Sequence, residues 1–534
     1  MSIRVHTHRL SVAAALTLTL AAASVARAQS SQAPSVPPGP LTLEQVLAIA
    51  EARSEAVGIA QVGVTRTEGD AVRARANERP QLSAAASYDR SLANEFQGVF
   101  DNVNFGGSDN NGSNDGSSDN GLADLPFGRA NTWRATLSFS QNVYSGGRIG
   151  AQKQLASLGR TSAEQALVGA RGQLRYEVTQ AYYDALLAER LVVIAQATLE
   201  QAGATLKQTQ AGFDAGTQPE FEVLRATVSR DSQTPLLIRQ RSNRDVAMLR
   251  LKQLLELPAD YDLRLADDLG DPRLVPAPVF AERVVPVENA LRSASSVSVS
   301  LSEAPLPERN VVAEAGTVIS LREASLKAVE AERLPSVSFT SNYSRIAYPS
   351  GALPVFDRAN WSLGVSMSVP ILTGGRQKGD EMVARADVET ARLQQKQVQE
   401  LAGLDTRSAW AELVAARAAW EATAGTVQQA NRAYEIADVR YRAGVSTQLE
   451  LSDSRLQLQQ AEANRALAAR DLQVARARVA LLPELPLGAA TSGTARPAAA
   501  PGTQQQPPPS QQQQGRTQLV NAAAQQGQSQ TGTR

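Results

Sequence analysis

The sequence contains no cysteine, and its only two histidines, His6 and His8, lie within the first ten residues. We interpret residues 1–28 as a signal peptide, so the mature chain is expected to hold neither a thiol nor an imidazole. Catalysis by Ser-His-Asp or Cys-His groups is thereby excluded, and so are metal sites with His or Cys ligands. We expect no cofactor and no metal centre.

Long apolar runs are also missing, because no stretch after residue 28 approaches the ~18 residues of a transmembrane helix. The run at residues 10–23 is shorter, follows Arg4 and Arg9, and leads to a small-x-small site at Ala26-Arg-Ala28. This pattern is typical of a secretory signal peptide that is removed after export. No cysteine follows the cleavage site, so we expect no lipid anchor on the mature N-terminus.

Aromatic residues make up only 4% of the sequence, and basic and acidic residues are balanced at 53 each. A balanced charge gives no indication of a nucleic-acid partner. An exported glycosidase with a pair of carboxylates is a further alternative. No aromatic sugar platform and no compact β/α alternation accompany the acidic residues, so we do not expect an enzyme.

A period of two appears at residues 361–371. Apolar residues take one set of alternate positions, and mostly serine, glycine and proline take the other. This is the pattern of a β-strand with one apolar face and one small polar face. The apolar positions are Trp361, Leu363, Val365, Met367, Val369 and Ile371.

The period changes after the turn residues Gly374, Gly375 and Arg376. From there to Tyr441 the chain has no proline and consists mostly of Ala, Gln, Arg, Glu, Leu and Val, a composition that favours a helix. Such a helix would reach about 99 Å at roughly 1.5 Å per residue. It is predicted to end at Tyr441-Arg-Ala-Gly444, where Gly444 supplies a left-handed cap.

The same unit occurs a second time, 228 positions earlier. A strand that begins near Trp133 leads to Gly146, Gly147 and Arg148, and a second long helix ends at Phe213-Asp-Ala-Gly216. We expect Gly216, like Gly444, to adopt a positive φ. The interval from the second glycine of the turn to the closing glycine is 69 residues in both copies. Equal spacing across strand, turn, helix and cap indicates an internal two-fold repeat.

These units divide the chain into six segments. We predict a signal peptide (1–28), a disordered leader (29–40), a first repeat (41–260), an inter-repeat segment (261–286), a second repeat (287–483) and a disordered, low-complexity tail (484–534). Within the first repeat we predict a helix over 41–77 interrupted by Gly58, Gly63 and Gly69, a strand over 81–90, and a helix over 219–257. Residues 258–286 read as irregular. The second repeat is predicted to contain helices over 287–302, 318–334 and 447–482, and a strand over 336–344.

Residues 101–121 form a low-complexity stretch rich in Asp, Asn, Gly and Ser. Its acidic residues leave open a calcium-binding loop, but their spacing fits no repeated calcium motif. We favour a solvated extracellular loop between two strands. The acidic residues are Asp101, Asp109, Asp115 and Asp119.

Four strands per chain constrain the architecture. The smallest β-barrels that span a membrane have about eight strands, and open sheet edges are not tolerated in lipid. Either the sheet lies outside a membrane, or several chains share one barrel. The aromatic starts at Trp133, Tyr343 and Trp361 and the serine-rich opposite faces suit a lipid-facing wall and a wet lumen. For Trp410 and Trp420, which lie on a predicted helix, we expect a place in a helical core.

The paired units of strand, Gly-Gly-Arg turn and long helix resemble the TolC-type outer membrane efflux protein family over about residues 41–483. The resemblance implies a mainly α homotrimer in which three chains of four strands give a twelve-stranded outer-membrane β-barrel, continued by a long α-helical barrel across the periplasm. It also implies a passive exit duct for tripartite efflux or type I secretion. The implied partners are outer-membrane lipids, a periplasmic adaptor (membrane fusion) protein and an inner-membrane pump of RND or ABC type.

The resemblance also implies roles for residues at the ends of the long helices. The turns at Phe213, Gly216, Tyr441 and Gly444 would be the periplasmic tips that meet the adaptor. Acidic residues just past such tips line a closed aperture in this family. By position these acids are Glu222, Glu450 and Asp453, the first two being Glu where Asp is more familiar.

Two alternatives remain open at this stage. The three carboxylates could simply be solvated helix faces. In addition, Ser446 stands where some members of the family carry an arginine that locks the aperture, so the resemblance does not extend to that ion pair. A trimeric surface stalk or adhesin without a transport role also uses export and long helices. A stalk would place its strands together at one end of the sequence, whereas here they precede both helical halves.

Overall fold

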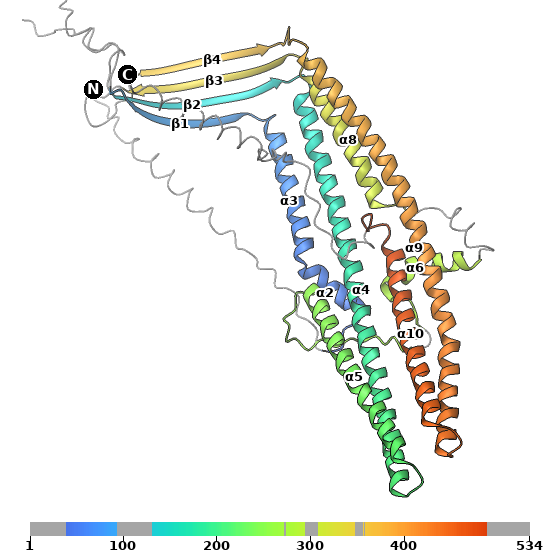
Figure 1. Ribbon diagram of the computed structural model, residues 1–534. Coiled ribbons are helices and arrows are strands. Elements are labelled where there is room, and N and C mark those ends of the chain that lie inside the picture. The colour runs from blue at the N-terminus through green and yellow to red at the C-terminus, as the bar shows by residue number, and fades with distance from the viewer. Residues whose placement is uncertain are drawn as a thin grey trace, which may run out of the picture. The chain divides into compact units, whose positions relative to one another are not determined.

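The computed structural model describes residues 39–92, 131–271, 274–293, 308–347, 356 and 358–488. The chain divides into two units, Met1–Leu487 and Gly488–Arg534, and every element below belongs to the first. The predicted signal peptide, the 101–121 loop and nearly all of the predicted tail lie outside the described residues. The elements are α2 (Leu43–Arg53), α3 (Glu55–Ala76), β1 (Gln81–Arg90), β2 (Asn131–Tyr144), α4 (Arg148–Asp214), α5 (Glu220–Leu254), α6 (Pro278–Ser293), α8 (Asn310–Ala331), β3 (Ser336–Ala347), β4 (Arg358–Ser368), α9 (Arg376–Arg442) and α10 (Gln448–Leu481) (Figure 1).

Two long helices, α4 and α9, run through the molecule, and each contains 67 residues. Neither contains a proline, and both begin directly after a Gly-Gly turn and end at the predicted tips. The prediction of two matched long helices is therefore confirmed. Within the described residues, no helix has a stretch long and apolar enough to cross a membrane.

The four strands form one antiparallel sheet in the order β1-β2-β3-β4, so β1 and β4 are its two edges. The registers place the apolar alternate residues on one face and mostly serine, threonine and asparagine on the other. Tyr88 pairs with Trp133, and Tyr343 pairs with Trp361. The apolar face carries Leu82, Tyr88, Trp133, Leu137, Phe139, Phe339, Tyr343, Trp361, Leu363, Val365 and Met367.

The helices pack side by side at two levels. Near the sheet, α4 packs against α3 and α8, and α8 packs against α9; toward the tips, α4 packs against α5 and α10, and α10 packs against α9. Two pairs of shorter helices meet at their ends between these levels. The Asn310 N–H at the start of α8 donates to the Pro483 carbonyl just past α10 (2.8 Å), and the Glu55 N–H of α3 donates to Glu256 Oε1 just past α5 (2.7 Å).

The level at which these helices meet contains a polar core. The Tyr182 hydroxyl lies 2.9 Å from Asp267 Oδ2 and is fully buried, and burial raises the pKa of this phenol. Arg476 Nε donates to Glu288 Oε1 (2.7 Å), and Arg309 Nη1 donates to Asp405 Oδ2 (2.6 Å). Buried guanidinium groups are tolerated here because carboxylates pair with them. These contacts join α6 to α10 and the start of α8 to α9.

Three predicted boundaries are wrong. The first helix breaks at Ser54 and not at the glycines: Ser54 caps α3 by accepting from the Val57 N–H, and the glycines at 58, 63 and 69 lie inside α3. The stretch expected to be irregular holds the start of α6, whose first residue is Pro278, a favoured first helical position. The helix predicted over 318–334 begins earlier, at Asn310, whose N–H donates a hydrogen bond to the carbonyl of Pro483.

Candidate functional site

The two helix tips have the same backbone conformation. Gly216 and Gly444 both have φ 72°, and their N–H groups donate to the carbonyls of Phe213 (2.8 Å) and Tyr441 (3.0 Å). A left-handed residue at this place closes the helix, and glycine adopts it without strain. The predicted positive φ at both tips is confirmed.

The aromatic residues of the two tips differ in their surroundings. Phe213 is 41% exposed, whereas Tyr441 is 7% exposed. The Tyr441 hydroxyl lies 2.8 Å from Thr209 Oγ1 on α4. Tyr441 also packs in a small cluster with Ala437 and Leu451. Of the two predicted docking side chains, only that of Phe213 is presented to solvent.

The strand-to-helix turns also share their backbone. Gly146 and Gly147 have φ 62° and 90°, and Gly374 and Gly375 have 61° and 89°. The two turns differ in how closely other residues pack against them. A Cβ added to Gly146 would lie 2.6 Å from Leu334 Cβ, whereas a Cβ added to Gly374 would have no neighbour within 4 Å. The first turn therefore needs glycine for packing as well as for conformation. The arginines that follow, Arg148 and Arg376, begin α4 and α9, and Arg376 lies 3.6 Å from Asp380.

Glu222 is turned toward the other helical hairpin. The Gln448 amide is oriented so that its nitrogen faces this carboxylate. The amide nitrogen donates to Glu222 Oε2 (2.9 Å) and to the Glu222 carbonyl (3.1 Å), and the amide oxygen accepts from the Ala226 N–H (3.0 Å). Arg225 lies 3.6 Å from Glu222 on the same helix. Glu222 thus takes part in the contact between α5 and α10.

Glu450 is held by partners on both sides of its tip. Arg440 Nη1, near the end of α9, lies 3.2 Å from Glu450 Oε1, and the Ser446 hydroxyl donates to Oε2 (2.8 Å). The backbone N–H of Glu450 donates to Thr447 Oγ1, which caps α10. Ser446 therefore supports the carboxylate by a hydrogen bond, and the cation comes from α9.

Asp453 lies exposed one turn further along α10, where it accepts from Gln457 Nε2 (2.9 Å). At about 100° per residue, Glu450 and Asp453 share one side of α10, and Gln448 lies on the other. Within one copy of the chain, the three predicted carboxylates are not brought together: Glu222 faces the neighbouring hairpin, and the other two face away from it.

A further charged residue of this region escaped the sequence reasoning. Arg455 is 5% exposed, and its Nη2 donates to Ser229 Oγ on α5 (2.6 Å). Among the described residues no carboxylate lies within ion-pair distance of it, and burial lowers the pKa of this guanidinium. Like Gln448, which is fully buried, it lies where α10 faces α5. Their spacing of two turns on α10 was the available signal, but nothing in the sequence says which face of α10 meets α5.

Within the described ranges, no group of three or more His, Cys, Asp or Glu side chains is arranged to hold a metal ion. The polar groups at the tips instead bind one another. Their arrangement joins two helical hairpins and presents two carboxylates at the start of α10.

Comparison with known families gives a match to the family described as outer membrane efflux protein. It covers residues 46–256 and 303–483, which is more than half of the chain. The two matched ranges contain both long helices and both tips. The segment between them, residues 257–302, includes α6 and the whole inter-repeat segment (261–286).

Curated relatives carry names that refer to export. The outer membrane efflux protein BepC of Brucella suis is 24% identical over 278 residues, which cover 52% of this chain and 55% of BepC. The pyoverdine export outer membrane protein OpmQ of Pseudomonas aeruginosa is 25% identical over 435 residues, covering 79% of this chain and 80% of OpmQ. The match thus spans little more than half of BepC and most of OpmQ.

Solved structures share the fold at low sequence identity. The outer membrane protein VceC of Vibrio cholerae gives a TM-score of 0.60 at 18% identity, over 82% of this chain and 95% of that chain. The CmeC outer membrane channel of Campylobacter jejuni gives 0.62 at 15% identity, over 84% and 86%. These likenesses show a shared fold. The family match shows that the chain belongs to the outer membrane efflux protein family and is a protein of the outer membrane.

Proposed function

We propose that three copies of this chain form an exit duct for a tripartite efflux or type I secretion system. The duct passively conducts cargo from an inner-membrane pump to the exterior. In this assembly each copy contributes four strands to a twelve-stranded β-barrel and its long helices to an α-helical barrel. The equal spacing of the two halves derives from an internal duplication.

The observation that carries the proposal is the sheet. One of its faces is apolar and the other mostly hydroxyl- and amide-bearing, and Trp361, Leu363 and Val365 are exposed on its apolar side. A membrane cannot accommodate the open edges β1 and β4. Because β1 and β4 run in opposite directions, β4 of one copy can pair antiparallel with β1 of the next, which closes a barrel with the apolar face toward lipid.

The helices support the second part of the proposal. Continuous helices of 67 residues reach about 100 Å at roughly 1.5 Å per residue, which is enough to carry the duct well beyond a membrane. Their far ends would meet a periplasmic adaptor through the tips at Gly216 and Gly444. The export names of BepC and OpmQ favour a duct over a surface stalk, which would need no polar lumen.

The aperture is assigned to the start of α10. Three-fold symmetry would repeat Glu450 and Asp453 as rings of carboxylates, and such rings select for cations in pores. Glu222 is assigned a different part in the same region, since its carboxylate and Gln448 hold α5 against α10. The Arg440 and Ser446 contacts keep the Glu450 side chain in place.

The test of the duct is the mass and conductance of the detergent-extracted mature protein. We expect a trimer that gives small, cation-favouring channels in planar bilayers. A water-soluble monomer with no conductance would overturn the proposal.

The same recordings test the aperture. Replacing Glu450 with Gln and Asp453 with Asn together should change the single-channel conductance or the block by cations. Glu435→Gln, on an exposed part of α9, is the matched control and should leave both unchanged. Identical traces from the double variant and the wild type would remove the assignment of these carboxylates to the aperture while leaving the duct intact.

A further inference from the structure

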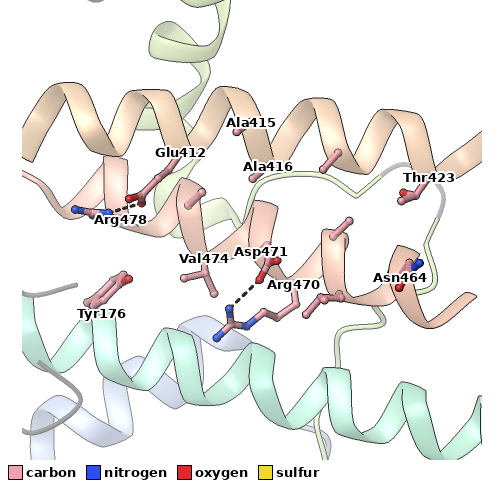
Figure 2. Close-up of a pocket in the computed structure, with 14 residues that line it drawn as sticks. Tyr176, Glu412, Ala415, Ala416, Thr423, Asn464, Arg470, Asp471, Val474 and Arg478 are labelled. Atoms are coloured by element: carbon pink, nitrogen blue, oxygen red, sulfur yellow. Dashed lines mark hydrogen bonds and ion pairs between the residues drawn. The ribbon is translucent and has the colours of Figure 1, made fainter. Parts of the chain in front are cut away.

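A pocket of about 590 Å³ lies between α4, α9 and α10 (Figure 2). It lies far along these helices from the tips at Gly216 and Gly444. Its apolar floor is made of alanines, including Ala415 and Ala416 of α9 and Ala468 of α10. Short side chains at these positions leave space that larger residues would fill. The volume falls in the range of about 300–1,000 Å³ that small-molecule sites occupy.

Two arginines, each paired with two carboxylates, lie at the walls of this pocket. Arg470 lies 2.9 Å from Asp471 and 2.6 Å from Asp184, and Arg478 pairs with Glu412 and with Asp405 (2.8 Å). Figure 2 shows the Arg470–Asp471 and Arg478–Glu412 contacts, with Tyr176 of α4 beside them. Burial raises the pKa of the Tyr176 phenol, so this side chain stays neutral.

The carboxylates, and not the guanidinium groups, face solvent. The side chains of Glu412 and Asp471 are 52% and 45% exposed, whereas those of Arg470 and Arg478 are 19% and 9% exposed. Arg309 binds the other oxygen of Asp405, so the two groups of ion pairs together hold four carboxylates and three guanidinium groups. A ligand in the pocket would therefore contact an apolar, alanine-rich surface on one side and exposed carboxylates on the other.

The pocket opens on the side of α10 opposite to α6. Gln473 donates to the Val275 carbonyl (2.8 Å), and Arg476 binds Glu288 of α6. At about 100° per residue, Gln473 lies about 200° around α10 from Asp471. The layer of long helices thus has one face covered by α6 and one face that carries the pocket.

In the proposed duct, the pocket face is the inner one. Twelve helices spaced about 10 Å apart give a ring about 38 Å across, and a passage about 28 Å wide once a helix radius of about 5 Å is subtracted on each side. Three copies of α6, each about 10–12 Å thick, would block this passage. α6 therefore lies outside and the pocket faces the lumen.

We infer that this pocket is a transit site that binds organic cations with an apolar body as they pass through the duct. This inference rests on the proposed function, because only the duct makes the pocket face an inner passage. The alanine floor takes the apolar body, and Glu412 and Asp471 face its positive charge. The buried arginines hold the two carboxylates in place from below.

The probes are tetraphenylphosphonium and tetraphenylborate, which have nearly the same size and opposite charge. Equilibrium binding is measured on the detergent-extracted, full-length assembly. We expect tetraphenylphosphonium to bind at least about tenfold more tightly than tetraphenylborate, since about 1.4 kcal/mol corresponds to a factor of ten. Equal affinity for the two ions would overturn the inference.

Charge removal in the pocket gives the second arm. The double variant Glu412→Gln, Asp471→Asn should weaken tetraphenylphosphonium binding about tenfold, and the control Glu435→Gln should leave it unchanged. The lumen placement is tested with Ala416→Cys, a lone thiol in a cysteine-free chain. A charged thiol reagent should modify this cysteine in the assembled protein, and bound tetraphenylphosphonium should slow the modification.

The outcomes separate the two proposals. If the wild type conducts but binds neither ion, or if the cysteine at 416 cannot be modified in the assembled protein, the transit site is wrong and the duct stands. A neighbouring copy that fills the pocket would give that result. If the wild type does not conduct at all, the duct itself fails, whatever the binding data show.

Discussion

At the scale of single residues, the two tips show that backbone conformation is set by the nearby sequence, whereas side-chain burial depends on distant residues. The positive φ of Gly216 and Gly444 could be predicted from sequence, because a glycine after a long helical run specifies its own cap. The burial of Tyr441 could not, since it depends on Thr209, 232 positions away in sequence. Phe213 occupies the equivalent place in the other half and remains exposed.

This difference between local conformation and packing can be measured with a pair of alanine substitutions. Gly444→Ala places a side chain at φ 72° and should destabilise the α9–α10 tip by about 1 kcal/mol or more. Gly425→Ala, in the interior of α9 with nothing within 4 Å of the added Cβ, should instead stabilise its helix by about 0.5–1 kcal/mol. Hydrogen exchange of the amides around each site reports both changes. Equal amide protection in the two variants would contradict the role of Gly444 as a left-handed helix cap.

At the scale of elements, composition predicted the long helices well. Absence of proline and an excess of helix formers define α4 and α9 to within a residue or two. The break at Ser54 and the start of α6 were missed for a different reason. Ser54 ends one helix and caps the next, and α6 is held by contacts such as that between Glu288 and Arg476, which join segments far apart in sequence. The same limit applies to the site, where Glu222 and Glu450 look alike in sequence but face different neighbours.

The contact between α5 and α10 carries an unusual buried charge. Arg455 is almost fully buried, and its guanidinium donates across the contact to the hydroxyl of Ser229. A buried cation without a carboxylate is costly, so Arg455→Met should strengthen the contact by about 1 kcal/mol or more. Slower hydrogen exchange in residues 226–232 would show this. Arg455→Lys keeps the charge and should give no such gain; faster exchange in Arg455→Met would mean that the guanidinium holds the two helices together.

At the scale of the whole molecule, the open sheet edges are the main incomplete feature. The proposed trimer pairs β1 of one copy with β4 of the next, and the natural chain has no cysteine to confuse a cross-linking experiment. Ser87→Cys on β1 can be combined in turn with cysteines at Asn360, Ser362, Gly364 and Ser366, which lie on the same polar face of β4.

We expect at least one of these pairs to give covalent dimers and trimers on oxidation, because facing positions on paired strands come within disulfide range. The single variant Ser87→Cys is the control and should remain monomeric under denaturing conditions. If every pair behaves like this control, β1 and β4 do not meet across copies and the shared barrel is wrong.

The end-to-end contacts between α5 and α3 and between α10 and α8 have a mechanical consequence. A continuous helix transmits bending along its length, whereas two helices that only abut can tilt against each other at the junction. Among the helices in the described part of the chain, only α4 and α9 cross that level without a break. A force applied at the tips therefore reaches the sheet through these two helices, and the lower parts of α5 and α10 can change their angle while the sheet and the upper helices keep theirs.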